Sequence, residues 1–182
     1  MRRLEESDLT ERVRWFNSEP IYSNVPIDIP ASLNDTRKWF SNNALNQSRR
    51  DFTAILSEGS DQNLISMAGL VAIEYRHRCA EFYMFMNPNF IGRGLGTLVL
   101  RWVCNYGFTE LALNKISLFT VESNVGARKF YERNGFVPEG CLRKHHLHRG
   151  QFVDRYIHGL LSADWKKQSW SLEAPPSAEI SL

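Results

Sequence analysis

Apolar residues recur at helical spacing near the N-terminus and predict two short helices. The first begins with a capping side chain at Ser7-Asp8 and ends near Pro20. The second begins at Ser32, where Asp35 three residues later forms a capping box. Its apolar stripe consists of Leu33, Trp39, Phe40 and Leu45. The long irregular connection between the two helices is the kind of segment that lines a substrate entrance.

The middle of the chain alternates between strand and helix patterns. Three runs rich in β-forming residues, at 51–56, 64–75 and 81–86, predict an antiparallel meander. The helix that follows is marked by apolar residues spaced three and four apart, which are Leu95, Leu98, Val99, Trp102, Val103 and Tyr106. A further strand at 115–121 lies beyond this helix, so we expect it to run parallel to the strand at 81–86.

The last third of the pattern predicts one more helix and a hairpin. Residues 124–134 indicate a helix that ends at Gly135, which suits the left-handed position after a helix C-terminus. Strands at 136–146 and 152–161 are predicted to pair across a turn near Arg149-Gly150.

Length and composition bound the domain organisation. The 182 residues, 43% of them apolar, are enough for one well-buried core and too few for two ordinary domains. We therefore expect a single α/β (α+β) domain at residues 1–165 with a mixed central sheet. Residues 166–182 contain several serines and prolines and few aliphatic side chains, so they predict a flexible C-terminal tail.

Hydropathy, charge and cysteine content indicate a cytoplasmic protein and argue against membrane and nucleic-acid partners. No run of about eighteen apolar residues predicts a membrane span, and the N-terminus lacks the apolar stretch of a signal peptide. We therefore expect a cytoplasmic protein with no membrane partner. The formal net charge is only +2 and the basic residues are dispersed, which argues against nucleic acid as a partner. Cys79, Cys104 and Cys141 are predicted to be reduced, mostly buried thiols.

The most informative motif is the alternation of Gly92, Gly94 and Gly96 between a strand pattern and a helix pattern. Such a turn exposes backbone N–H groups at a helix N-terminus, where the helix dipole favours an anion such as a phosphate or diphosphate. No lysine follows the glycines as a Walker loop requires, and Thr97 stands where the dinucleotide fingerprint needs glycine or alanine. The remaining readings are another phosphorylated ligand and a turn with only a conformational role.

Three motifs in one order resemble the GCN5-related N-acetyltransferase (GNAT) superfamily over roughly residues 4–165. Residues 91–96 are similar to the family's acyl-CoA diphosphate loop. Residues 124–136 resemble a second family motif, a helix that starts after an asparagine and is followed by a Gly-Phe pair. Residues 80–88 lead into the loop as the family's strand does. The branch it resembles contains ribosomal-protein N-terminal, spermidine and sugar-amine acetyltransferases. The resemblance implies acetyl-CoA as cosubstrate, no metal, and a GNAT fold with helices on both faces of the sheet.

The resemblance also implies which residues hold the cofactor. They are Phe85, Met86, Ile91, Gly92, Arg93, Gly94, Leu95, Gly96, Thr97, Asn124, Ala127 and Lys129. The sequence departs from the family at Ile91, where glutamine or arginine is usual. Because backbone N–H groups hold most of a diphosphate, we expect binding to persist, either more weakly or with help from Arg93. Asn124 is expected to cap its own helix and to contact the cofactor.

The implied chemistry is attack of a primary amine on the acetyl thioester, followed by expulsion of a thiolate. An ammonium group with a pKa of about 10 is only about 0.1% neutral at pH 7, so a base is needed. Glu81 is the candidate, and an exposed carboxylate at a strand start is the alternative. Tyr131 occupies the family's position for the acid that protonates the sulfur, against an alternative as a core aromatic. Backbone N–H groups at a bulged strand end, at Phe85 and Met86, would stabilise the oxyanion.

The acceptor is less defined than the cofactor. A polyamine site should present several carboxylates, whereas Glu19, Asp28 and Asp35 in the entrance segments are balanced by basic residues. A small-molecule amine such as a polyamine or an amino sugar is the first expectation. A protein N-terminal amine is the second, and a non-catalytic acyl-CoA-binding module is the third.

Two further features complete the sequence-based expectations. In a regular strand His146 and His148 share a face and His145 points away, so exposed or substrate-lining roles are favoured over a zinc site. The last strands permit a homodimer.

Overall fold

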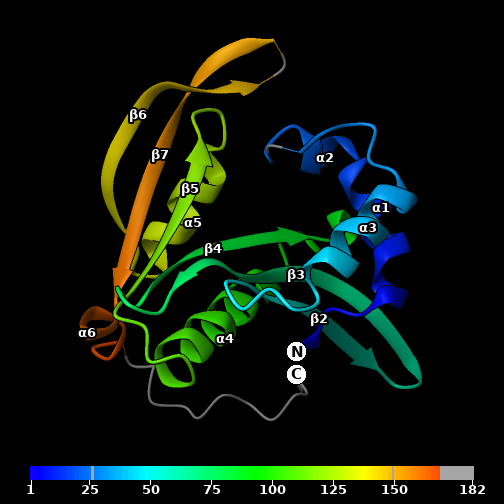
Figure 1. Ribbon diagram of the computed structural model, residues 1–182, viewed down its shortest axis with the longest axis horizontal. Coiled ribbons are helices and arrows are strands. Elements are labelled where there is room, and N and C mark those ends of the chain that lie inside the picture. The colour runs from blue at the N-terminus through cyan, green and yellow to red at the C-terminus, as the bar shows by residue number, and fades with distance from the viewer. Residues whose placement is uncertain (26, 149, 169–182) are drawn as a thin grey trace.

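The computed structural model describes residues 1–25, 27–148 and 150–168, and it contains one mixed seven-stranded sheet with helices against both faces (Figure 1). The strands are β1 (Arg2–Arg3), β2 (Arg50–Glu58), β3 (Asp61–Glu74), β4 (Cys79–Met86), β5 (Lys115–Val121), β6 (Val137–His148) and β7 (Gln151–Leu161). They lie in the order β1-β2-β3-β4-β5-β7-β6. As predicted, β2, β3 and β4 form an antiparallel meander, and β5 runs parallel to β4 because a helix connects them.

The helices divide between the two faces of the sheet. They are η1 (Glu6–Asp8), α1 (Leu9–Phe16), α2 (Glu19–Tyr22), α3 (Leu33–Asn43), η2 (Pro88–Phe90), α4 (Leu95–Thr109), α5 (Val125–Arg133) and α6 (Ser162–Trp165). The helices α4 and α5 cover one face, and the three N-terminal helices lie over the other (Figure 1). None of the helices among the described residues is long and apolar enough to cross a membrane.

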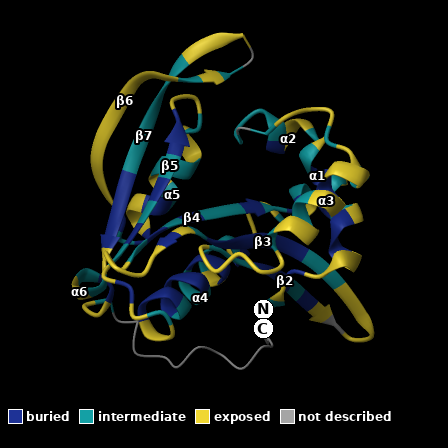
Figure 2. Cartoon of the chain, in the orientation of Figure 1, coloured by how far each residue is buried: buried dark blue, intermediate teal, exposed yellow. Residues whose placement is uncertain are grey.

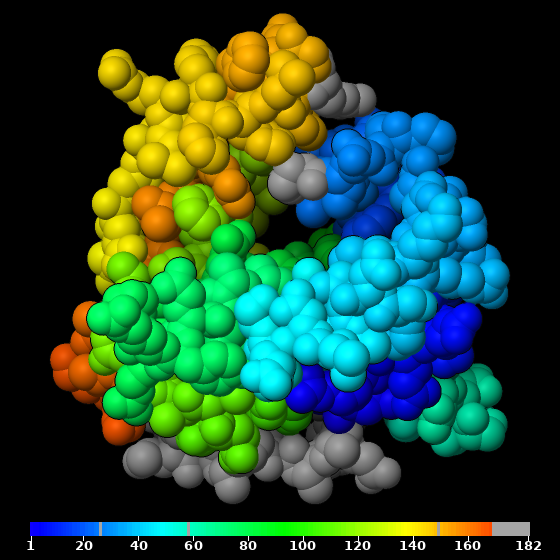
Figure 3. Space-filling view, viewed as in Figure 1, coloured from blue at the N-terminus to red at the C-terminus, as the bar shows by residue number. Residues whose placement is uncertain are grey.

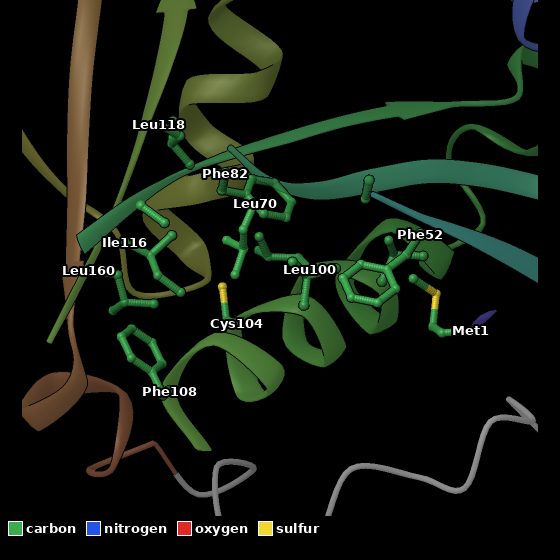
Figure 4. Close-up of a cluster of buried hydrophobic side chains, with 14 of the residues drawn as sticks. Met1, Phe52, Leu70, Phe82, Leu100, Cys104, Phe108, Ile116, Leu118 and Leu160 are labelled. Carbon is green, nitrogen blue, oxygen red and sulfur yellow. The ribbon is translucent and has the colours of Figure 1, made fainter. Parts of the chain in front are cut away.

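Two apolar cores hold these layers together. In the larger core, Leu100 and Cys104 of α4 meet Leu70 of β3 and Ile116 of β5, and all four are at most 1% exposed (Figure 4). The smaller core lies under α1, where Trp15 and other buried side chains pack against the opposite face of the sheet. Burial of one large apolar side chain stabilises the fold by about 1.5–3 kcal/mol, so both faces of the sheet are firmly covered. Figure 2 shows the resulting buried stripe along the central strands.

The second predicted helix begins as expected, but its stripe is shorter. The Ser32 hydroxyl accepts a hydrogen bond from the Asp35 N–H at 3.0 Å, and α3 starts at the next residue, Leu33. Leu45 was wrongly placed in the apolar stripe, because it lies beyond the end of α3 and is 93% exposed.

The first helix also departs in detail from the prediction. No side-chain hydrogen bond caps α1 itself, but Asp8 belongs to a capping box one turn earlier, where its carboxylate accepts the Glu5 N–H at 3.0 Å at the start of η1. The same carboxylate accepts hydrogen bonds from Arg2 at 2.6 and 2.7 Å and from the Thr53 hydroxyl at 2.8 Å. Pro20 does not end a helix but stands in the first turn of α2, where the missing N–H costs no hydrogen bond.

The C-terminal part matches the prediction apart from its exposed edge. Gly135 has a φ of 91°, which confirms the left-handed residue after α5. Strands β6 and β7 pair antiparallel, and the predicted turn includes residue 149, which lies outside the described residues. Cys104 is buried as predicted, whereas Cys141 is exposed on the edge strand β6, contrary to the expectation. Most of the predicted tail, residues 169–182, lies outside the described residues.

Candidate active site

The glycine loop connects β4 to α4, as predicted. Gly94 has a φ of 79°, a left-handed conformation that glycine adopts without strain, and it is the residue that precedes the first turn of α4. No side chain caps this helix end. The first N–H groups of α4 are therefore available to an anion, and the helix dipole favours one.

A cavity of ≈ 550 Å³ opens in front of this helix end. It lies between β4, the glycine loop and α5, and part of α2 borders it. Nine of the predicted cofactor residues line it: Phe85, Met86, Ile91, Gly92, Gly94, Gly96, Thr97, Asn124 and Ala127. An apolar groove that ends on uncapped N–H groups fits an acyl-CoA, which has a long chain and a diphosphate.

Three predicted cofactor residues do not line this groove. Leu95 is 4% exposed and packs in the larger core, because the first turn of α4 aims it at the sheet. Lys129 is exposed on α5, away from the groove wall. The Arg93 guanidinium lies 4.8 Å from the ring centroid of Phe90, at the outside of the loop.

Several lining residues were missed by the sequence reasoning. Met84 of β4 and Phe130 and Arg133 of α5 face the groove, as do residues of the segment 20–25. Met84 and Phe130 are neighbours of predicted site residues, and helix and strand periodicity would have pointed to them. The segment 20–25 carries no pattern that predicts its fold back onto the glycine loop.

Asn124 caps α5, as expected. Its side-chain oxygen accepts a hydrogen bond from the Ala127 N–H at 3.1 Å, and the residue also lines the groove. The cap fixes the start of the helix that carries Tyr131 two turns later.

Tyr131 lies at the junction of the groove and the larger core. Its ring is 8% exposed and packs edge-on against Phe82, with ring centroids 6.1 Å apart, and against Phe136 at 5.8 Å. The residue also lines the cofactor groove. Burial, and to a smaller extent the nearby Cys104, raises the pKa of the Tyr131 hydroxyl above its usual value. The hydroxyl therefore stays protonated at neutral pH and is able to donate a proton.

Strands β4 and β5 diverge beside the groove. They pair only from Cys79–Lys115 to Glu81–Ser117, and beyond this point the sheet is open. The Asn87 N–H donates to the Ile65 carbonyl of β3 at 2.9 Å. Because successive residues of a strand alternate in direction, the N–H groups of Met86 and Met84 point toward the gap. They are positioned to stabilise an oxyanion there.

The expected bulge at the end of β4 is wrong. Strand β4 keeps its register with β3 from Phe82 to Met86, and the register shift lies between Val71 and Glu74 at the other end of β3. The gap arises because β5 turns away from β4. Of the two residues suggested for the oxyanion, Met86 has its N–H on the open side and Phe85 has its N–H toward β3.

Glu81 lies on the opposite face of β4 from Phe82, at the last paired position before the gap. Burial raises the pKa of its carboxyl group, and the Arg155 guanidinium, 3.5 Å away, opposes this shift without cancelling it. Arg155 reaches Glu81 from β7 across the ring of Phe119, whose centroid is 3.9 Å from the guanidinium carbon. The carboxylate is thus a stronger base than usual.

A hollow separates the N-terminal helices from the β6–β7 hairpin on this acceptor side (Figure 3). A cavity of ≈ 430 Å³ there is lined by Tyr22, Asp28, His146, His148 and neighbouring residues. The rings of His146 and His148 stack with centroids 6.3 Å apart, which agrees with the expected shared face. Burial, Arg155 and the neighbouring histidines lower the pKa of His146. Within the described residues, no group of three histidine, cysteine or acidic side chains is placed to hold a metal.

Comparison with known proteins decides the family. The acetyltransferase (GNAT) domain family matches residues 1–137, which include the glycine loop and the whole of α5. The chain belongs to the GNAT acetyltransferase family. This GNAT protein is an acetyl-CoA-dependent N-acetyltransferase.

Relatives of this GNAT protein include characterised enzymes. A spermidine N(1)-acetyltransferase of Vibrio cholerae is 30% identical over 154 residues, covering 85% of this chain and 87% of the relative. The spermidine N(1)-acetyltransferase of Escherichia coli K12 is 30% identical over 155 residues, or 84% and 80% of the two chains. A solved structure of the Vibrio cholerae spermidine N-acetyltransferase in complex with CoA and spermine aligns with a TM-score of 0.83. It is 29% identical and covers 90% of this chain and 95% of its own.

Proposed function

We propose that this acetyltransferase transfers the acetyl group of acetyl-CoA to the primary amine of a small molecule, with Glu81 as base and Tyr131 as acid. One observation carries the proposal. The divergence of β4 and β5 joins the cofactor groove to the acceptor side, with Tyr131 on the groove side of the sheet and Glu81 on the other. An amine and a thioester that enter from the two sides meet at this gap.

The reaction needs two proton transfers at different atoms. Glu81, directly or through a water molecule, takes a proton from the ammonium group, and the free amine attacks the thioester carbonyl carbon. The negative charge on the carbonyl oxygen is stabilised by the Met86 N–H. The intermediate then collapses, the carbon–sulfur bond breaks, and Tyr131 donates its proton to the departing sulfur. The raised pKa of the partly buried Glu81 carboxyl makes it a stronger base, and the raised pKa of the buried Tyr131 phenol keeps its proton in place until the thiolate forms.

The names of relatives bear on the acceptor. Two similar proteins are spermidine N(1)-acetyltransferases, so a polyamine belongs among the candidate acceptors. A second candidate is a protein N-terminal amine, because a putative ribosomal N-acetyltransferase of Bacillus subtilis is 30% identical over 106 residues. That match covers only 58% of each chain, which favours the small-molecule acceptor.

The location and the assembly are part of the proposal. Three free cysteines support a reducing compartment such as the cytoplasm. The edge strand β6 exposes Val137, Leu142 and Leu147, which supports a homodimer formed through the last strands.

Thiol release tests the proposed function. The protein is mixed with acetyl-CoA and a panel of amines that includes spermidine, an amino sugar and a short peptide, and free CoA is measured with a thiol reagent. The Tyr131→Phe variant should lose about 100-fold or more in turnover while it keeps its affinity for acetyl-CoA. Glu132→Gln, at the neighbouring exposed position of α5 and outside the groove, is the control in the same helix. If wild-type protein binds acetyl-CoA and no amine on the panel releases thiol, the proposed function is wrong.

A further inference from the structure

Arg12 is a buried cation outside the catalytic groove. It stands on α1 and is 7% exposed. Its guanidinium carbon lies 4.4 Å from the ring centroid of Trp39, 4.6 Å from that of Phe16 and 5.0 Å from that of Phe85. No carboxylate among the described residues lies within ion-pair distance of it: its hydrogen-bond partners are the Tyr83 hydroxyl and, weakly, the Met67 sulfur at 3.9 Å, and Asp51 attracts it from further away.

The side chains around Arg12 leave one positive charge in excess. Arg49 donates two hydrogen bonds to the Asp51 carboxylate, at 2.7 and 2.8 Å, and the Tyr83 hydroxyl donates to the same carboxylate. Burial keeps Tyr83 protonated by raising its pKa, so the phenol contributes no negative charge. The Asp51 carboxylate is thus the one negative charge near two guanidinium groups, those of Arg12 and Arg49. A buried charge that its neighbours do not balance is costly, and a negatively charged ligand would balance it.

Arg12 lines a cavity that a ligand is able to enter. This cavity, of ≈ 500 Å³, lies between α1, α3 and the segment 27–32. Asp28 and Asp35 also border it, but both are exposed. Asp35 is already bound to the Ser32 hydroxyl at 2.7 Å and lies 3.5 Å from Lys38. The carboxylates therefore stand at the solvent side, and the buried end of the cavity is formed by the arginine and the aromatic rings.

The cavity is close to the point of acetyl transfer. Glu81, Tyr83 and Phe85 project from the same face of β4. Each lies about 7 Å along the strand from the next. Arg12 contacts Phe85, which also lines the cofactor groove. An acceptor molecule that spans about 10 Å would place its amine near Glu81 and its other end near Arg12.

We propose that Arg12 binds a negatively charged group of the acceptor, so that the preferred substrates are primary amines that carry a carboxylate or a phosphate. This inference rests on the proposed function and narrows its substrate class. The planar guanidinium is suited to two parallel hydrogen bonds with either group. A polyamine would add positive charge beside a cluster that already has two guanidinium groups and one carboxylate, which disfavours it relative to an acidic amine of the same size.

Matched pairs of amines test the charge preference in the wild-type full-length protein. The pairs are matched in length to the distance of about 10 Å: 6-aminohexyl phosphate is compared with 6-amino-1-hexanol, 8-aminooctanoate is compared with octylamine, and spermidine is the cationic reference. We expect kcat/KM to be at least tenfold higher for the acidic member of one pair, and the pair that responds identifies the charged group. In the presence of CoA, the same acidic amine should also raise the melting temperature more than its neutral partner does.

Substitutions connect the preference to Arg12. Arg12→Met should reduce the acidic-to-neutral ratio of kcat/KM to about one, mainly through a higher KM for the acidic amine, and Arg12→Lys should keep part of it. Arg14→Met, at an exposed position of the same helix, is the matched control and should keep the full preference. Circular dichroism checks that each variant folds. If Arg12→Met does not fold, the role of Arg12 is decided by the acidic-to-neutral ratio of kcat/KM in the wild-type protein and in Arg12→Lys.

The two proposals fail in different ways. If neutral amines or spermidine are acetylated as well as or better than their acidic counterparts, or if Arg12→Met keeps the preference, the role of Arg12 is wrong and the acetyltransferase function stands. If no amine releases thiol, the proposed function is wrong, and the thermal shift with acidic amines then decides the role of Arg12 alone.

Discussion

At the scale of single residues, the proposed base and the proposed acid differ in what shifts their pKa values. Tyr131 is enclosed by aromatic rings, and burial, with a smaller effect of Cys104, raises the pKa of its phenol. For Glu81 two effects oppose each other, because burial raises the pKa and Arg155 lowers it. If Glu81 is the base, Arg155 therefore lowers the pH at which the base becomes active.

Removal of Arg155 should shift the pH profile toward higher pH. A base acts when it is deprotonated, so activity falls as the pH drops through its pKa. Arg155→Gln removes the attraction that lowers the Glu81 pKa, so the acid limb of the profile, the pH at which kcat/KM falls on the acid side, should move to a higher value. The measurement is kcat/KM for one fixed amine across the pH range. Arg143→Gln, on the exposed strand β6, should leave the limb in place.

An unchanged or downward-shifted acid limb in Arg155→Gln would show that Glu81 is not the group that limits activity at low pH. Glu81→Gln then tests the role of this carboxylate directly. The fall of kcat/KM at low pH should disappear in this variant only if Glu81 is the base.

At the scale of elements, the first turn of α4 serves the ligand more than the fold. A Cβ atom added to Gly96 would lie 3.7 Å from the Met84 methyl group and 3.7 Å from the Phe130 ring, which is ordinary van der Waals contact. Gly96→Ala should therefore fold with little change in stability. The added methyl group projects into the groove, and acetyl-CoA affinity should fall at least tenfold.

Calorimetric titration with acetyl-CoA, together with a melting curve, separates these two effects. Gly140→Ala on β6 is the control, because its added Cβ meets only a methyl group of Ile157 at 3.5 Å. Undiminished affinity in Gly96→Ala would mean that the diphosphate does not approach this helix end.

The N-terminal elements are joined by one carboxylate. Asp8 at the end of η1 is 2% exposed, and it binds Arg2 of β1 and Thr53 of β2. Asp8→Asn should lower the free energy of unfolding by about 2–3 kcal/mol, because the charged hydrogen bonds are lost while the Thr53 hydroxyl stays buried. Chemical denaturation measures this change, and Glu11→Gln on the exposed face of α1 should cost far less.

The same carboxylate makes stability depend on pH. Burial of Asp8 favours a higher pKa, but the hydrogen bonds from Arg2, the Glu5 N–H and Thr53 outweigh this effect and lower it. Its contribution is complete above the unfolded-state pKa of about 3.9 and is lost as the pH falls through the lower folded-state pKa. Wild-type protein should thus lose stability below about pH 4 more steeply than Asp8→Asn does. Equal slopes would contradict this linkage.

At the scale of the whole molecule, the sequence predicted what depends on local pattern. Periodic apolar residues and turn residues located the meander, α4 and α5, and the glycine run located the cofactor groove. The sequence pattern did not predict contacts between distant segments. Arg155 and Glu81 are 74 positions apart, and no pattern in either segment predicts their ion pair.

The cluster around Arg12 shows the same limit. An arginine in an amphipathic helix usually lies on the solvent face, and its burial here depends on rings that α3 and β4 supply. Leu45 was misplaced for the converse reason, because an apolar residue at helical spacing has no effect once the helix has ended. Sequence pattern thus located the groove at the start of α4, whereas the cavity beside Arg12 depends on the packing of the N-terminal helices.

The most direct test of acetyl transfer at the β4–β5 gap is a parallel count of both products. Acetylated amine is quantified by mass spectrometry and free CoA by thiol titration, for wild-type protein and for Tyr131→Phe. We expect one acetylated amine for each free thiol in wild-type protein, and neither product above background in a Tyr131→Phe variant that still binds acetyl-CoA. Thiol release without acetylated amine, or full activity in Tyr131→Phe, would contradict the account.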